Sequence, residues 1–249
     1  MSKVLIVHAD DFNLTPGVNQ GIVQGFSDGT VRSTSIMANR PGLSQAVTGL
    51  PQGLDLGLHF NLTMGRPLSP AKSVPSLVRE DGQFHQRKAL PEQPLAAVDI
   101  ATELVAQLDA VGATGVKLSH IDTHHHIHED ERVFASLLKV ARQRGLAVRC
   151  YGPDMYRILQ AEGVRSPQHL IVRFYDDGVT MENLKFILGM LPQGVSELCC
   201  HPAVVDDELR GISSYTEPRA KELELLCSPD IKSCIAAEGI RLAGYADAF

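Results

Sequence analysis

Strand-like and helix-like stretches alternate along almost the whole chain, and this alternation limits the fold more than any other feature. Residues 4–9 form a continuous apolar run, typical of a strand covered on both faces. Residues 16–29 then repeat apolar side chains at helical spacing, after a Thr15-Pro16 start signal. Such repetition implies a mostly parallel sheet in an α/β fold. The same periodicities predict strands at 31–38, 56–62, 117–123, 147–151, 170–175 and 197–200, and helices at 95–111, 131–144, 180–190, 217–227 and 229–238.

Length and composition favour one globular domain. The 249 residues contain no repeat, low-complexity tract or linker, so we expect a single domain over residues 1–249. An apolar fraction of 44% suffices for a full core, and a net charge of −6 gives no reason to expect nucleic acid or membrane as partner. Five cysteines without a CxxC pair favour reduced thiols in the cytoplasm. The first apolar run is too short for a signal peptide, and no stretch reaches the length of a membrane span.

Residues 64–93 break the alternation. Five prolines lie from Pro67 to Pro94, with Gly65 and Gly82, and no periodicity holds. A loop of this length inside a compact domain is usually functional, and we expect a role such as that of a lid.

Metal-binding residue types gather where strands are predicted to end. Four of the ten histidines fall within residues 124–128, directly after the strand at 117–123. Imidazole is a poor core filler but a common side-chain ligand for divalent metals. In parallel α/β folds, reactive groups meet at the carboxyl ends of strands. The sequence therefore predicts a metal site with open positions for water and substrate, and its other candidate residues are Asp10, Asp11, His59 and His201.

Each of these residues also has a structural interpretation. Asp10 and Asp11 could cap the first helix, and His59 could be a hydrogen-bonded core histidine. His201 is a lone histidine before a proline, which is a weak signal. The histidine run could be a solvated loop, but its position after an apolar strand argues against that. His8 lies within the first strand and is assigned a structural role.

Strand geometry limits how the candidates share a site. Neighbours on a strand point to opposite faces, so Asp10 and Asp11 can both enter the site only if the chain is already leaving the strand, as residues 12–16 suggest. One aspartate can then bind the ion while the other acts as a base. Of the clustered histidines, His124 lies nearest the strand, and Asp122 on the same face is expected to steady it.

At these residues the chain resembles the YdjC-like carbohydrate deacetylases, the ChbG/HpnK group. Residues 62–68 and 215–226 look most like the chitooligosaccharide deacetylase branch. The one departure noted is Asn13, where the family usually has glycine, and asparagine tolerates left-handed backbone angles. The matching strings are collinear and span most of the chain: Ala9-Asp10-Asp11-Phe12, Gly21-Ile22, Ser33-Thr34-Ser35, 58–63, 120–128 and Cys200-His201-Pro202.

The resemblance implies an irregular TIM-like (β/α) barrel of mostly parallel strands. It implies removal of an N-acetyl group from an amino sugar in chitin degradation, with diacetylchitobiose or its 6-phosphate as substrate and a homodimer as assembly. It implies one divalent metal held by Asp11, His59 and His124. Family resemblance favours Mg²⁺, whereas two imidazole ligands favour Zn²⁺ or another transition ion. In the mechanism we expect, Asp10 is the general base and His201 protonates the leaving nitrogen.

Other functions fit parts of this pattern. The same ligands could serve a deacetylase of a lipid-linked, hopanoid-type amino sugar, a metal-dependent sugar isomerase, another amidohydrolase, or an inactive metal-binding or regulatory barrel. An isomerase usually needs more carboxylates, and an inactive barrel would lack the base. NodB-type polysaccharide deacetylases have their two histidines a few residues apart, unlike His59 and His124. The roles of Asp10 and Asp11 could also be exchanged. Three arginines could bind sugar hydroxyls or phosphate, or be structural: Arg66, Arg149 and Arg219.

Overall fold

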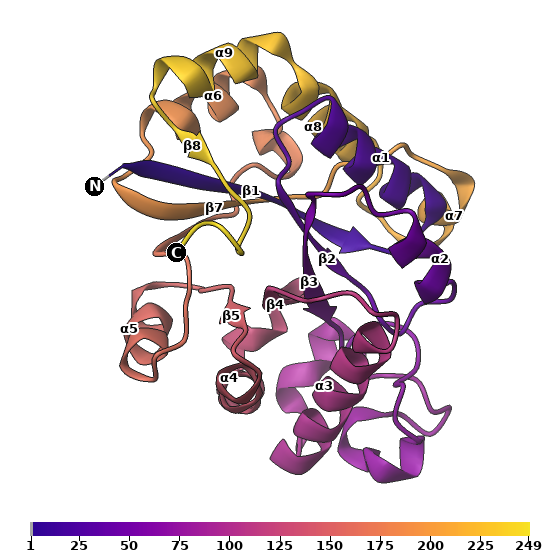
Figure 1. Cartoon of the computed structure of the whole chain (residues 1–249). Coiled ribbons are helices and arrows are strands. Elements are labelled where there is room, and N and C mark those ends of the chain that lie inside the picture. The colour runs from indigo at the N-terminus through magenta and orange to yellow at the C-terminus, as the bar shows by residue number, and fades with distance from the viewer. Residues whose placement is uncertain (1) are drawn as a thin grey trace.

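One curled sheet of parallel strands organises the molecule (Figure 1). The computed structural model describes residues 2–249. Its strands follow the order β5-β4-β3-β2-β1-β7-β6, and β8 pairs with β1 as well. The sheet forms a half-barrel with helices between its strands, which confirms the predicted α/β, barrel-like class. The strands are β1 (Lys3–Phe12), β2 (Ser33–Ile36), β3 (Asp55–Phe60), β4 (His120–Thr123), β5 (Ala147–Val148), β6 (His169–Ile171), β7 (Gly194–Cys200) and β8 (Arg241–Leu242).

The helices cover the outside of the sheet in two groups (Figure 1). In one group α1, α8 and α9 pack against one another near β1, and in the other α3 packs on α4 beside β3 and β5. Among residues 2–249, no helix is both long and apolar enough to cross a membrane. The helices are α1 (Pro16–Ser27), α2 (Leu43–Thr48), α3 (Ala97–Gly112), α4 (Glu131–Arg144), α5 (Pro153–Ala161), α6 (Met181–Gly189), α7 (Asp207–Ile212), α8 (Glu217–Cys227) and α9 (Pro229–Ala237).

Periodicity located most elements, but it gave the ends of only some of them. The helices predicted at 131–144 and 217–227 have the observed bounds, whereas the strand predicted at 31–38 is only β2. The short helices α2, α5 and α7 were not predicted. In α2 and α7, six residues carry too little helical periodicity to stand out from a loop. The N-cap at Thr15 is confirmed, since its side chain accepts a hydrogen bond from the backbone nitrogen of Val18.

The segment 64–93 is irregular but packed. It contains three short 3₁₀ helices, Ala71–Ser73, Pro75–Leu77 and Arg87–Glu92. Its apolar side chains enter the main core, among them Leu77 at 0% exposure and Phe84 at 2%. The segment therefore forms a wall of the molecule, held by apolar burial in the absence of regular structure.

Candidate metal centre

A bulge in β1 brings both aspartates to the same edge of the sheet. The pairing of β1 with β2 shifts register between Ala9 and Phe12, and Asp11 has a φ of 73°, in the left-handed region. The expectation that the chain has left the strand at this point is wrong, since β1 continues to Phe12. The extra residue of the bulge, not the end of the strand, removes the alternation that would have separated Asp10 from Asp11.

Asn13 also adopts a left-handed conformation, with a φ of 71°. This is the conformation that asparagine was expected to tolerate in place of glycine. Its side-chain nitrogen donates to the carbonyl oxygen of Met37 at 3.1 Å, which ties the end of β1 to the residue after β2.

Asp11, His59 and His124 meet at the bottom of a cavity. Asp11 Oδ1 lies 3.2 Å from His59 Nε2 and 3.1 Å from His124 Nδ1. The two ring nitrogens are 3.3 Å apart, and all three residues are buried. The structure thus brings together the three residues that the sequence proposed as ligands, from the ends of β1, β3 and β4.

The spacing of these three atoms fits one divalent ion. A tetrahedral ion bonded to nitrogen and oxygen at about 2.0–2.1 Å holds its ligand atoms about 3.4 Å apart. One carboxylate and two imidazoles form a set suited to zinc or a similar transition ion, and three protein ligands leave a position open. The types of ligand atom and the distances between them therefore both fit a zinc-type ion.

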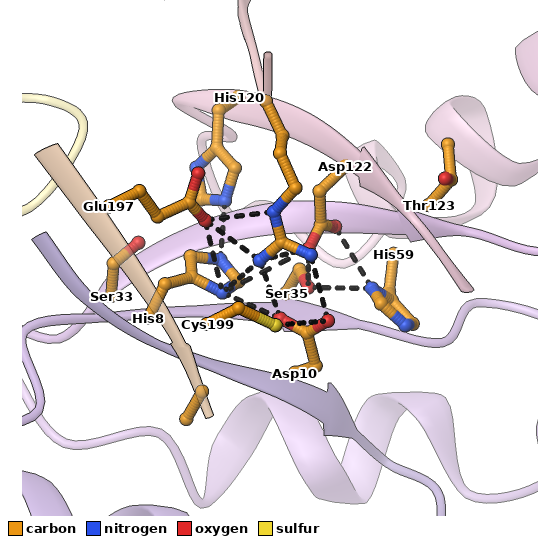
Figure 2. A network of polar contacts seen from close by, with 12 residues as sticks. His8, Asp10, Ser33, Ser35, His59, His120, Asp122, Thr123, Glu197 and Cys199 are labelled. Atoms are coloured by element: carbon orange, nitrogen blue, oxygen red, sulfur yellow. Dashed lines mark hydrogen bonds and ion pairs between the residues drawn. The ribbon is translucent and has the colours of Figure 1, made fainter. Parts of the chain in front are cut away.

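Asp122 supports His59, not His124 as expected from the sequence. Its Oδ1 lies 3.0 Å from His59 Nδ1, and Ser35 Oγ lies 3.0 Å from the same nitrogen (Figure 2). These partners leave His59 Nε2 directed at the metal position. Burial lowers the pKa of His59, but Asp122 and Asp11 outweigh it and raise the pKa to about 10. The site thus attracts positive charge. The expected face was wrong because Thr123 and His124 turn into the 3₁₀ segment His124–Glu129.

Asp10 sits in a buried ion network that adjoins the ligands through Asp122. Arg149 donates to both of its carboxylate oxygens, at 2.8 and 2.6 Å, and His8 Nδ1 lies 2.9 Å from Oδ1. Asp122 and Glu197 converge on the same place (Figure 2), where the Arg149 guanidinium is 3.0 and 2.7 Å from them. Burial opposes ionisation of Asp10, but Arg149 holds its pKa well below the usual value. Arg149 is 0% exposed, so of its two sequence interpretations the structural one holds.

His201 follows β7 and faces Asp10. Its Nε2 is 3.8 Å from Asp10 Oδ2, and its backbone nitrogen donates to the Glu222 carboxylate. Burial lowers the pKa of His201 to about 4, so the ring is neutral near pH 7. A neutral histidine cannot begin a reaction as an acid and must first receive a proton.

Five further histidines lie in the cavity wall or in the core. His125 and His126 line the cavity with left-handed φ angles of 61° and 53°. His128 is buried, with its Nδ1 2.5 Å from Thr123 Oγ1. His8 Nε2 lies 2.8 Å from His120 Nε2 inside the sheet, in agreement with the structural role assigned to His8.

The cavity has a volume of about 650 Å³, within the range of small-molecule sites. Sequence reasoning left Arg219 undecided, and the structure places it in the wall, with Nη2 2.8 Å from Asp11 Oδ2. Arg66 is exposed. Gln86 and Arg87 belong to the segment 64–93, for which a functional role was expected, and Tyr215 begins one of the stretches that carry the resemblance, but none of the three was named as a site residue. Three further wall residues were missed because nothing in their local sequence marks them: Val172, Tyr175 and Ile212.

Fold and site together define a parallel α/β half-barrel enzyme class with a buried, metal-competent centre at its strand ends. The YdjC-like protein family model matches residues 4–237. A carbohydrate deacetylase of Thermoanaerobacter pseudethanolicus is 40% identical over 247 residues, covering 98% of both chains. Another, of Geobacillus stearothermophilus, is 37% identical, again covering 98% of each. The chain belongs to the YdjC-like family.

A solved structure has the same fold. The crystal structure of a candidate cellobiose-phosphate cleavage protein from Enterococcus faecalis V583 has a TM-score of 0.92 to this chain. It is 33% identical and covers 98% of this chain, and 98% of its own length is covered.

Proposed function

We propose that this chain is a metal-dependent hydrolase that removes the N-acetyl group from an amino sugar. The observation that carries the proposal is the Asp11, His59 and His124 set, with donor atoms 3.1–3.3 Å apart. Asp10 and His201 lie beside it on the same cavity. The similarity to carbohydrate deacetylases along the whole chain supports this function over an isomerase or an inactive barrel.

Asp11, His59 and His124 would hold the ion. When bound, such an ion supplies Lewis acidity toward the acetyl oxygen and lowers the pKa of water. The donor set favours zinc or another transition ion over Mg²⁺, which prefers oxygen ligands. Asp122 and Ser35 orient His59, and Arg219 neutralises the second oxygen of Asp11.

Asp10 and His201 would move the protons. Arg149 and His8 keep Asp10 ionised and fixed, so it is ready to accept a proton from the attacking water, at some cost in basicity. His201 is neutral and therefore needs a proton before it can act as an acid. Asp10, 3.8 Å from His201 Nε2, passes on the proton that it took from the water, and His201 delivers this proton to the departing amide nitrogen. Water adds to the acetyl carbon, the C–N bond breaks, and acetate and a free amine leave.

Acetate release tests the proposal. Purified protein is incubated with diacetylchitobiose, with its 6-phosphate and with an N-acetylated lipid-linked amino sugar, before and after chelation. We expect acetate from one of the disaccharides, loss of acetate after chelation, and recovery when zinc or another divalent ion is added back. Absence of acetate from all three substrates in metal-loaded protein would remove the proposed function, and activity that survives chelation would remove its metal dependence.

A further inference from the structure

The cavity contains an aromatic surface that the metal centre does not use. Tyr175 stacks on Tyr215, with ring centroids 4.1 Å apart and planes 9° from parallel. Both residues line the cavity, and Tyr175 is nevertheless 46% exposed. Since one face of the Tyr175 ring rests on Tyr215, the opposite face is the one left open.

Polar contacts fix this pair in place. The Tyr215 hydroxyl donates to Glu222 Oε1 at 2.5 Å and accepts from the backbone nitrogen of Asp176 at 3.2 Å. Asp176 has a φ of 51°, a conformation that costs energy for a residue other than glycine. The Arg219 guanidinium lies 5.6 Å from the Tyr215 ring centre. The Tyr175 ring therefore rests on a support that is already organised before any ligand arrives.

The position of Tyr175 in the cavity separates it from the reacting group. Val172 and Ile212 line the same cavity and are 39% and 38% exposed, so its wall offers exposed apolar side chains as well. Asp11, at the floor, is only 2% exposed. The ring centroids of Tyr175 and Tyr215 lie 5.7 and 5.8 Å from that of His201, so the stacked pair borders the group that meets the nitrogen. Tyr175 is the more exposed member of the pair.

We propose that Tyr175 binds the sugar ring next to the one that is deacetylated, so that the site prefers saccharides of two or more rings to a single ring. The inference rests on the proposed deacetylase function. A pyranose presents C–H groups on its face, which pack on an aromatic ring, and hydroxyls at its edge. Thr63, Gln86 and Arg87 line the cavity as well and offer hydrogen-bonding groups for those hydroxyls.

Two substrates and three variants test whether the Tyr175 ring is a platform for the second sugar. The kcat/KM for acetate release is measured with N-acetylglucosamine and with diacetylchitobiose, and the disaccharide-to-monosaccharide ratio is compared between proteins. Tyr175→Ala should lower this ratio about tenfold, mostly through KM, because stacking is lost only for the second ring. Tyr175→Phe keeps the ring and should stay within about twofold of the wild type. Phe186→Ala removes another exposed aromatic ring, on α6, and should leave both substrates unaffected.

An unchanged disaccharide-to-monosaccharide ratio in Tyr175→Ala would overturn the inference, whether both substrates lose activity equally or neither loses any. If wild-type protein releases no acetate from these two sugars, from diacetylchitobiose 6-phosphate or from the lipid-linked amino sugar, the proposed function fails instead. Binding of diacetylchitobiose to the same variants, measured by saturation-transfer NMR, then tests, independently of the deacetylase function, whether Tyr175 binds a sugar ring. Weaker binding only in Tyr175→Ala supports it, and equal binding in all variants removes it.

Discussion

Asp10 and Asp11 are neighbours in the chain but have different electrostatic partners. Arg149 and His8 contact Asp10, whereas Arg219 and the two ligand histidines contact Asp11. The sequence could propose both residues but left their roles open. The structure separates them, because the left-handed turn at Asp11 directs one carboxylate to each set of partners.

Substitution of each aspartate should therefore have a different effect. Asp10→Asn should retain the metal and lower kcat/KM by ~10²–10⁴-fold, since only the base is lost. Asp11→Asn should lose the metal itself, because one of three ligands is weakened. Metal content by elemental analysis, measured beside acetate release, distinguishes the two. If Asp10→Asn were the variant that lost the ion, the assigned roles would be reversed.

Arg149 should be essential for stability. Replacement by Met leaves the buried carboxylates of Asp10, Asp122 and Glu197 without their counter-charge, which should cost about 3–5 kcal/mol in the free energy of unfolding. Urea denaturation of metal-free protein measures this. Arg144→Met is the matched control, since Arg144 pairs with Asp109 at the surface and should cost about 0–1 kcal/mol. Equal losses in both variants would contradict the buried network.

Among the secondary-structure elements, α3 holds the irregular segment that follows β3. Glu103 on α3 accepts hydrogen bonds from the backbone nitrogens of Leu68 and Ser69, both at 2.9 Å. Asp99 on the same helix accepts one from the backbone nitrogen of Ser76 at 2.9 Å. The sequence indicated a functional loop from its prolines and length. It could not show this anchoring, because acidic residues on a helix usually face solvent.

Glu103→Ala should loosen this wall of the cavity. Two backbone donors, that of Ser69 buried and that of Leu68 partly buried, lose a charged acceptor. Each such hydrogen bond is worth about 1.5–3 kcal/mol, so amide exchange at Leu68 and Ser69 should rise at least tenfold. Because Gln86 and Arg87 in this segment line the cavity, KM should rise as well. Asp109→Ala, on the exposed part of α3, should change neither quantity. Unaltered exchange at Leu68 in Glu103→Ala would contradict the anchoring role.

For the whole molecule, buried neutral histidines predict sensitivity to acid. Burial lowers the pKa of His128 to about 3 and of His201 to about 4. At these two sites the unfolded chain therefore binds more protons than the folded chain below pH ~6.5, and their contribution to stability falls as the pH falls from there. The pKa values of His125 and His126, lowered by burial to about 3, act in the same direction, whereas the pKa of Glu222, raised by burial to about 8, acts in the opposite direction. His59 has the opposite sign, but its raised pKa of about 10 acts only above pH ~6.5.

Each of these two histidines should contribute about 1 kcal/mol of lost stability per pH unit below ~6.5. We expect a lower urea midpoint at pH 5.5 than at pH 7 in chelated protein. His201→Gln should reduce the difference, since it removes one of the titrating groups. A midpoint that did not change between the two pH values would contradict this prediction.

The amino-acid sequence alone determined the strand-helix alternation, the parallel sheet and the types of residue at the strand ends, because hydrophobic periodicity and residue type are local properties of the chain. Tertiary structure decided which atoms meet. Asp11 and His124 are 113 positions apart, and strand register, not local pattern, brings them within 3.1 Å. The same holds for Arg149, whose burial depends on carboxylates from three other strands, so no single segment could predict it.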